Sequence, residues 1–322
     1  MKKSMINSSH IEGYLYEHKL ENKVSGATSK NPGTEFISGT ISVATDESLL
    51  NVVQIHFTYV VPTFAKSGKP NTTYTTLQAI IDGKIPTVMD AGKESAGRVR
   101  VDSSIALNEW YDTRTAGNPL ISVKRNEGGF VHQMSAAEDL DTNVENRANF
   151  KADMVITKAA RVDADEEKGT PEKMILGGCI FDFRNAILPV EFTVLAPKAM
   201  DYFESQDISP KNPFFTQVAG NQVSQTVETT TTEESAFGEA MVKTTRSSHR
   251  DFVVTWAQAE PYAWDDESTI LASELDKAIA DREVYLADVK KRQDEYQATK
   301  GNALAGGASA ATSPKAGVEY NF

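Results

Sequence analysis

The sequence predicts a mainly β protein, in which a small all-β domain occurs twice and is followed by an amphipathic helix and a flexible tail. Apolar and polar residues alternate with a period of two as far as about residue 257, which is the period of half-buried strands. Two segments recur at a nearly constant offset, and beyond Trp256 the apolar period lengthens to that of a helix. The expected units are residues 10–134, a linker at 135–148, residues 149–258, a helix at 262–298 and a tail at 299–322.

The strands of the first domain are clearest in two runs. Residues 51–61 alternate, with Gln54 and His56 on the polar face, and residues 36–43 alternate in the same way. One short helix is expected at 74–81, where a glycine follows. The strands lie too close together in the sequence for β-α-β units, so an all-β domain with one helical insert is predicted.

The second domain is indicated by two matches with the first. Residues 36–45, FISGTISVAT, align with residues 174–183, MILGGCIFDF, at an offset of 138. Residues 56–62, HFTYVVP, align with residues 191–197, EFTVLAP, at an offset of 135. Because both matches occur in the same order, they favour a duplicated domain over one large sheet.

The predicted helix has apolar residues at helical spacing, acidic residues near its start and basic residues near its end. These apolar residues are Leu271, Leu275, Ile279, Leu286, Val289 and Tyr296. From Gly301 the chain is rich in Gly, Ala and Ser, a composition that does not bury a core and is expected to be disordered. Its apolar end, with Tyr320 and Phe322, is predicted to dock on a partner protein.

The acidic charge is unevenly distributed. The net charge is 33 − 45 = −12, but residues 1–133 carry 14 basic and 13 acidic groups, while residues 134–322 carry 19 and 32. The later part therefore holds the acidity, and the first domain is close to neutral. The chain has one cysteine and no run of about 18 apolar residues. We therefore expect a cytoplasmic protein without disulfides or a membrane partner.

Catalytic spacings are missing from the sequence. It contains no phosphate-binding glycine loop, no H-E-x-x-H and no G-x-S-x-G, and its five histidines are scattered. The carboxylate-rich stretches 138–141 and 163–167 fall in expected loops. Cys179 lies on an alternating strand and is expected to be a small buried residue. We predict that the protein is not an enzyme and that it holds no metal or cofactor.

A hairpin at residues 97–134 carries the most informative side chains. If Val99 and Val101 face the core, Arg98 and Arg100 face outward together with Trp110, and Lys124 joins them when Val123 points inward. An aromatic ring among cations suits a nucleic-acid strand, because bases stack on the ring while the cations follow the phosphates. The alternatives are that Trp110 belongs to the core, or that a bulge near Ser103 shifts the alternation. Tyr14 and Tyr16 lie on the same side of their strand, and the pattern favours an exposed and a buried position for this side equally.

Six segments between residues 10 and 134 follow one another in an order that is typical of a known family: Ile11–Leu15, Ile41–Ser48, Val52–Val60, Val99–Val101, Glu109–Asp112 and Gly128–Val131. In these segments the sequence resembles the oligonucleotide/oligosaccharide-binding (OB) fold single-stranded DNA-binding proteins of bacteria and their phages, and this resemblance covers residues 10–134. It implies a five-stranded Greek-key barrel in which Trp110 corresponds to an aromatic residue that stacks on DNA bases. The tail ending in Phe322 is similar to the family's protein-docking tail, although only Glu319 is acidic near its end.

The resulting prediction is a protein of two tandem OB-like five-stranded Greek-key barrels, a C-terminal amphipathic helix and a disordered tail. It is expected to bind single-stranded DNA without sequence preference and to protect it in replication or recombination, in the service of a phage genome. The expected DNA-binding residues are Trp110, Arg98, Arg100, Lys124, Arg125, Tyr14, Tyr16 and Tyr111. Replication or recombination proteins are the expected partners of the tail, and a homo-oligomer is left open. The alternative is a structural protein, such as a virion or tail component, that uses β-barrels for assembly.

Overall fold

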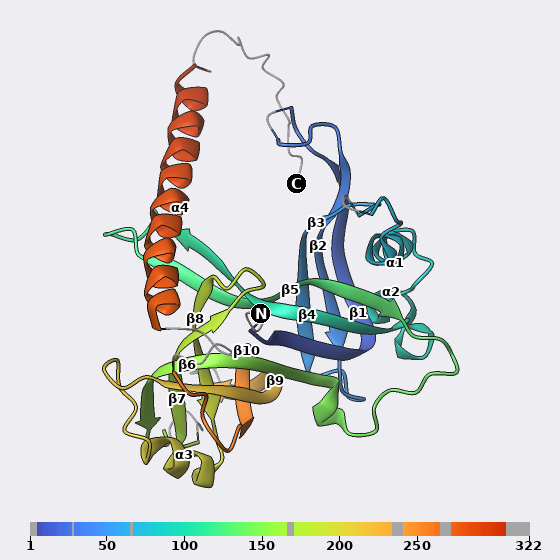
Figure 1. Ribbon diagram of the computed structural model, residues 1–322. Helices are drawn as coiled ribbons and strands as arrows, with labels where there is room; N and C mark the ends of the chain where they lie inside the picture. The colour runs from blue at the N-terminus through green and yellow to red at the C-terminus, as the bar shows by residue number, and fades with distance from the viewer. Residues whose placement is uncertain are drawn as a thin grey trace.

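A computed structural model describes residues 5–27, 29–64, 67–165, 171–233, 241–264 and 272–306. In these residues the protein is mainly β, as predicted: ten strands form one continuous sheet, and a long helix follows (Figure 1). No helix in the described ranges combines the length and apolar character needed to cross a membrane.

The first five strands form a ring, meaning a set whose pairings close on themselves. They are β1 (Asn7–Val24), β2 (Glu35–Ala44), β3 (Val52–Val60), β4 (Arg98–Tyr111) and β5 (Leu120–Gln133). Pairing runs in the order β1–β2–β3–β5–β4 and returns to β1, and only the β3–β5 contact is parallel. Helices α1 (Thr72–Ile81) and α2 (Val88–Ala91) lie between β3 and β4. We call this set the first ring.

The second ring repeats the same pairing order. Its strands are β6 (Ala148–Val162), β7 (Lys173–Phe181), β8 (Ile187–Val194), β9 (Phe214–Glu233) and β10 (Met241–Ala257), with α3 (Pro197–Glu204) between the third and fourth. The β8–β10 contact is parallel and the other pairings are antiparallel. Antiparallel pairing of β1 with β6 joins the two rings into one sheet.

Each ring encloses its own apolar core. In β4, Val99 and Val101 are fully buried in the first core, as the alternation predicts, and Leu77 of α1 closes it. In the second ring, Phe150 and Phe192 lie at the centre, with ring centroids 4.9 Å apart. Since alternate residues of every strand point inward, the intervening polar residues remain on the outer faces.

The C-terminal helix differs at both ends from the predicted range 262–298. It is α4 (Ala272–Gly306). Residues 262–264 lie on the second ring instead, because Tyr262 donates to the Asp153 carboxylate and the Trp264 ring packs 5.6 Å from Phe215. The expected tail at 299–306 is helical, in keeping with the helix propensity of its alanines. The rest of the expected tail, with Tyr320 and Phe322, lies outside the described residues.

Candidate nucleic-acid interface

The β4–β5 hairpin extends beyond the first ring. Strand β1 pairs with β4 only along Arg98–Ser103, whereas β4 and β5 continue to pair as far as Tyr111 and Leu120. The outer half of the hairpin is therefore a two-stranded ribbon, and the face with Ile105 and Leu107 packs against the second ring. Figure 1 shows this ribbon reaching from the first ring to α4.

A bulge at Gly128 and Gly129 decides which side chains share a face of the ribbon. The pairing shifts between Asp102 and Ser104, with the extra residue on β5. Both glycines have positive φ, and a Cβ on Gly129 would lie 1.8 Å from the Asp102 carbonyl oxygen, so glycine is required there. The bulge considered near Ser103 therefore exists, but its extra residue lies on β5 and not on β4.

Because of this bulge, the expected orientation of Val123 and Lys124 is wrong. Beyond it, Asn108 pairs with Val123 and Trp110 with Ile121, and these residues share a face with Arg125. Val123 is 46% exposed instead of buried. Lys124 lies on the other face, where its Nζ is 5.4 Å from the Phe192 ring centroid and burial lowers its pKa.

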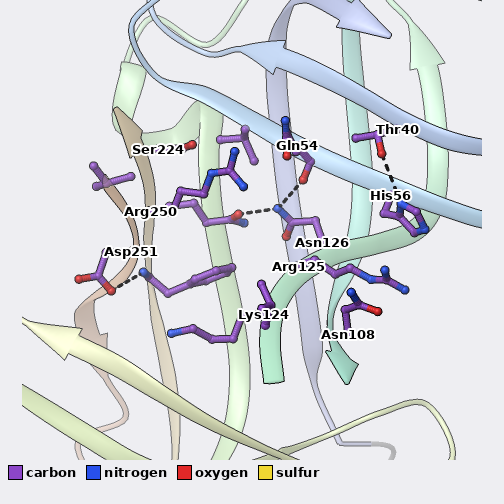
Figure 2. Close-up of a pocket in the computed structure, with 15 residues that line it drawn as sticks. Thr40, Gln54, His56, Asn108, Lys124, Arg125, Asn126, Ser224, Arg250 and Asp251 are labelled. Atoms are coloured by element: carbon purple, nitrogen blue, oxygen red, sulfur yellow. Dashed lines mark hydrogen bonds between the residues drawn. The ribbon is translucent and has the colours of Figure 1, made fainter. Parts of the chain in front are cut away.

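The face that carries Trp110 continues into a pocket between the two rings, with a volume of about 220 Å³. Figure 2 shows side chains from both rings converging on it. The first ring contributes Thr40, Val53, Gln54, His56, Asn108, Val123, Lys124, Arg125 and Asn126, and the second ring contributes Gln222, Val223, Ser224, Arg250, Asp251 and Phe252. We call this the inter-ring pocket.

Hydrogen bonds hold the second ring against the first at this pocket. Asn126 Nδ2 donates to the Gln54 carbonyl over 3.3 Å and to Gln222 Oε1 over 2.7 Å. The backbone N–H of Ser224 donates to Asn51 Oδ1 over 2.6 Å. These hydrogen bonds fix strand β9 beside β3 and β5. They thereby hold together the two walls of the inter-ring pocket.

Cations outnumber anions around the inter-ring pocket. Arg125 pairs with Glu127 over 2.5 Å, and Arg250 is exposed without an ion pair to any described residue. The Asp251 carboxylate is engaged by Thr193 Oγ1 at 2.7 Å and the Phe252 N–H at 2.8 Å. Burial and the nearby Arg125 charge lower the pKa of His56, which favours its neutral form at pH 7.

Helix α4 supports the ribbon from the face opposite Trp110. Glu109 forms a largely buried ion pair with Arg282. The Tyr111 N–H donates to Gln293 Oε1 over 2.9 Å, and Gln293 Nε2 donates back to the Tyr111 carbonyl. Trp110 remains 38% exposed. Tyr111 therefore lies on the face opposite Trp110, since successive residues of a strand point to opposite faces.

Arg98, Arg100 and Tyr14 lie at the far end of β4. Trp110 lies twelve positions after Arg98, about 40 Å along an extended strand. Arg100 Nε lies 2.7 Å from the buried Glu12 carboxylate, and Arg98 Nη2 donates to the Ser135 carbonyl over 3.0 Å. Arg98 and Arg100 keep the parity of Trp110 on β4, as the alternation predicts, but they lie at the opposite end of the strand, where partners from β1 and from the linker engage them.

The two expected tyrosines of β1 also lie away from the inter-ring pocket. The Tyr14 hydroxyl donates to Glu47 over 3.1 Å, and Lys93 Nζ lies 5.1 Å from the Tyr14 ring centroid. Burial raises the pKa of Tyr14. Tyr16 falls in the β-bulge between Leu15 and Glu17 and is partly buried. Neither tyrosine lines the pocket.

Replacement of Arg100 by alanine should lower the free energy of unfolding by about 2 kcal/mol, because it leaves the buried Glu12 carboxylate without its cation. Urea unfolding of the variant measures this loss. Affinity for single-stranded DNA should stay unchanged, because Arg100 lies ten positions from Trp110 along β4 and is engaged by Glu12. A large loss of DNA affinity in a folded Arg100→Ala protein would contradict this placement.

Several pocket residues were not among the residues predicted from the sequence. Gln54 and His56 were visible on the polar face of their strand, and Asn108 shares the parity of Trp110. Arg250 had no local signal, because it reaches the pocket from the second ring. A second exposed tryptophan, Trp256, is 48% exposed on the second ring, with Lys151 Nζ 5.9 Å from its ring centroid.

Comparison with known proteins adds a family match. A family model described as YorF matches residues 6–298. No curated protein matches the chain. Among solved structures, the chain is similar to a deletion mutant of the single-stranded DNA binding protein from Thermus aquaticus, with a TM-score of 0.44 and 10% identity over 82% of this chain and 99% of that chain.

Proposed function

The chain belongs to the YorF family, and we propose that this member binds single-stranded DNA without strong sequence preference. The proposal rests on the face of the β4–β5 hairpin that carries Trp110 and leads into the inter-ring pocket. An exposed tryptophan offers a stacking surface for an unpaired base, at about 1–3 kcal/mol per base. Arg125 and Arg250 beside the same surface offer positive charge to the phosphates.

The proposed architecture is a tandem pair of OB-like barrels, with domains at about residues 10–134 and 149–258. The closed pairing order of each ring, with a helix between its third and fourth strands, supports this assignment. In the first domain, the outer face of β2 and β3 and the β4–β5 hairpin border the inter-ring pocket. These are the parts with which OB-folds bind oligonucleotides.

Protection of single strands during replication or recombination is the role we propose for this binding, in a host cytoplasm and in the service of a phage genome. The proposal includes no catalytic step and no cofactor. The acidic later part of the chain would repel nucleic acid elsewhere on the protein, which favours binding at the cationic pocket.

Fluorescence anisotropy with a labelled single strand and the matching duplex, at two salt concentrations, tests the proposal. The single strand should bind more tightly, since stacking on Trp110 needs an unpaired base. With two or three phosphate contacts, the logarithm of the binding constant should fall with the logarithm of salt concentration at a slope of about −1.4 to −2.1. Equal binding of the duplex, or no binding of either, would overturn it.

A structural role in assembly is the second candidate, and exposed apolar residues on α4 favour it. Ile279, Val284 and Tyr285 are 45%, 70% and 45% exposed. Such residues on a long helix suit packing against another copy or a virion component. Analytical ultracentrifugation over a range of concentrations tests this role: assembly that Val284→Asp abolishes supports it, and a monomer at every concentration excludes self-assembly.

A further inference from the structure

We propose that the inter-ring pocket accepts one unstacked nucleobase of the bound strand, held by the carboxamides of Gln54 and Asn108. This inference rests on the proposed binding of single-stranded DNA and names what one part of the site holds. Hydrogen bonds to a base would then add to the affinity that comes from stacking on Trp110 and from the positive charge of the arginines.

The two carboxamides have free hydrogen-bonding capacity. Gln54 and Asn108 both line the pocket and are exposed. Within the described parts of the chain, neither side-chain amide takes part in a hydrogen bond, and the Asn126 side chain contacts Gln54 only at its backbone carbonyl. Each carboxamide offers two donors and one acceptor in a plane, which matches the edge of a base.

Asn126 supplies an independent indication of a ligand. Its side chain lines the pocket and is 3% exposed. The Nδ2 group donates to Gln54 and Gln222, while Oδ1 lacks a hydrogen-bond partner among the described residues. A buried acceptor without a donor is unfavourable, and an N–H of a base would satisfy it.

The lining favours a base over a phosphate inside the pocket. Its lining includes the apolar residues Val123 and Val223 and the acidic residue Asp251. Neutral amides beside apolar side chains suit a planar heterocycle. The exposed Arg250 is available instead to the phosphate attached to that base.

The position of Trp110 fits the same strand. Trp110 lies two residues from Asn108 on the same face of β4, about 7 Å along the strand. One base can therefore stack on Trp110 while a neighbouring base enters the pocket. A carboxamide can turn over to exchange its donor and acceptor, so the pocket needs a base but does not dictate which one.

The experiment compares two ligands of equal length and charge: a natural single strand and a chain of abasic deoxyribose phosphates. Anisotropy titrations use the full chain and the double variant Gln54→Ala with Asn108→Ala. The matched control removes two exposed carboxamides that do not line this pocket, Asn22→Ala with Gln133→Ala. Thermal unfolding of each variant verifies that it is folded, as expected for exposed side chains.

The double variant should bind the natural strand about tenfold more weakly and the abasic chain as the parent does. The loss should be similar for strands of dA, dC and dT, and the control should match the parent on both ligands. Equal losses on the natural and abasic ligands would show backbone contact and overturn the inference, as would no loss on either. Failure of the parent to bind any single strand would instead overturn the proposed function.

Discussion

Trp110→Ala is expected to lower the affinity for single-stranded DNA about 5- to 150-fold. The range corresponds to the loss of one base stacked on an aromatic side chain, worth about 1–3 kcal/mol. Trp110 is available for this contact because α4 holds the opposite face of the ribbon through Glu109 and Tyr111. Anisotropy with an oligonucleotide of dT measures the loss directly.

Trp256→Ala is the matched control, since it removes another exposed tryptophan from the other ring. Its affinity should equal that of the parent. Trp110→Phe should keep most of the binding, because phenylalanine retains a stacking ring. A Trp110→Ala protein that binds as tightly as the parent would refute the stacking assignment, and an equal loss in Trp256→Ala would place the strand elsewhere.

Asp153→Ala is expected to lower the free energy of unfolding by about 3–5 kcal/mol. The Asp153 carboxylate is fully buried and accepts from the Ile6 N–H at 2.8 Å, Gln217 Nε2 at 2.9 Å and the Tyr262 hydroxyl at 2.9 Å. It thereby ties the N-terminal segment, β9 and the connection to α4 to one point of the second ring. Without it, three donors lose their acceptor.

Urea unfolding of Asp153→Ala measures the loss, and Asp163→Ala is the control because Asp163 is exposed. The control should change stability by less than about 0.5 kcal/mol. Asp153→Asn should fall between them, since the amide keeps an oxygen acceptor for one or two of the donors. A fall below about 1 kcal/mol in Asp153→Ala would contradict the role of this carboxylate as an anchor.

Local patterns predicted much of the fold. The alternation placed Val99 and Val101 in the core, and the helix expected at 74–81 is α1. Asn71 caps its start by accepting from the Thr73 N–H, and Gly83, with φ of 71°, follows its end. These features depend on residues close together in the sequence, so they could be recognised without the structure.

The candidate site was harder to predict because it depends on contacts between distant segments. The Gly128–Gly129 pair was a visible sign of a bulge, yet its effect on Lys124 appears only in the register of β5 against β4. Arg100 was expected to face DNA, but it pairs with Glu12, 88 residues earlier. Arg250 reaches the pocket from a strand that no local pattern connects to Trp110.

Photo-crosslinking of a single strand carrying 5-iodouracil, followed by mass spectrometry of the peptides, tests most directly where the DNA binds. Crosslinks should occur at Trp110 and at His56, with weaker ones near Arg250, and Trp110→Ala should remove the strongest. Crosslinks confined to Trp256 or to α4, with none on the β4–β5 hairpin, would contradict binding at the inter-ring pocket.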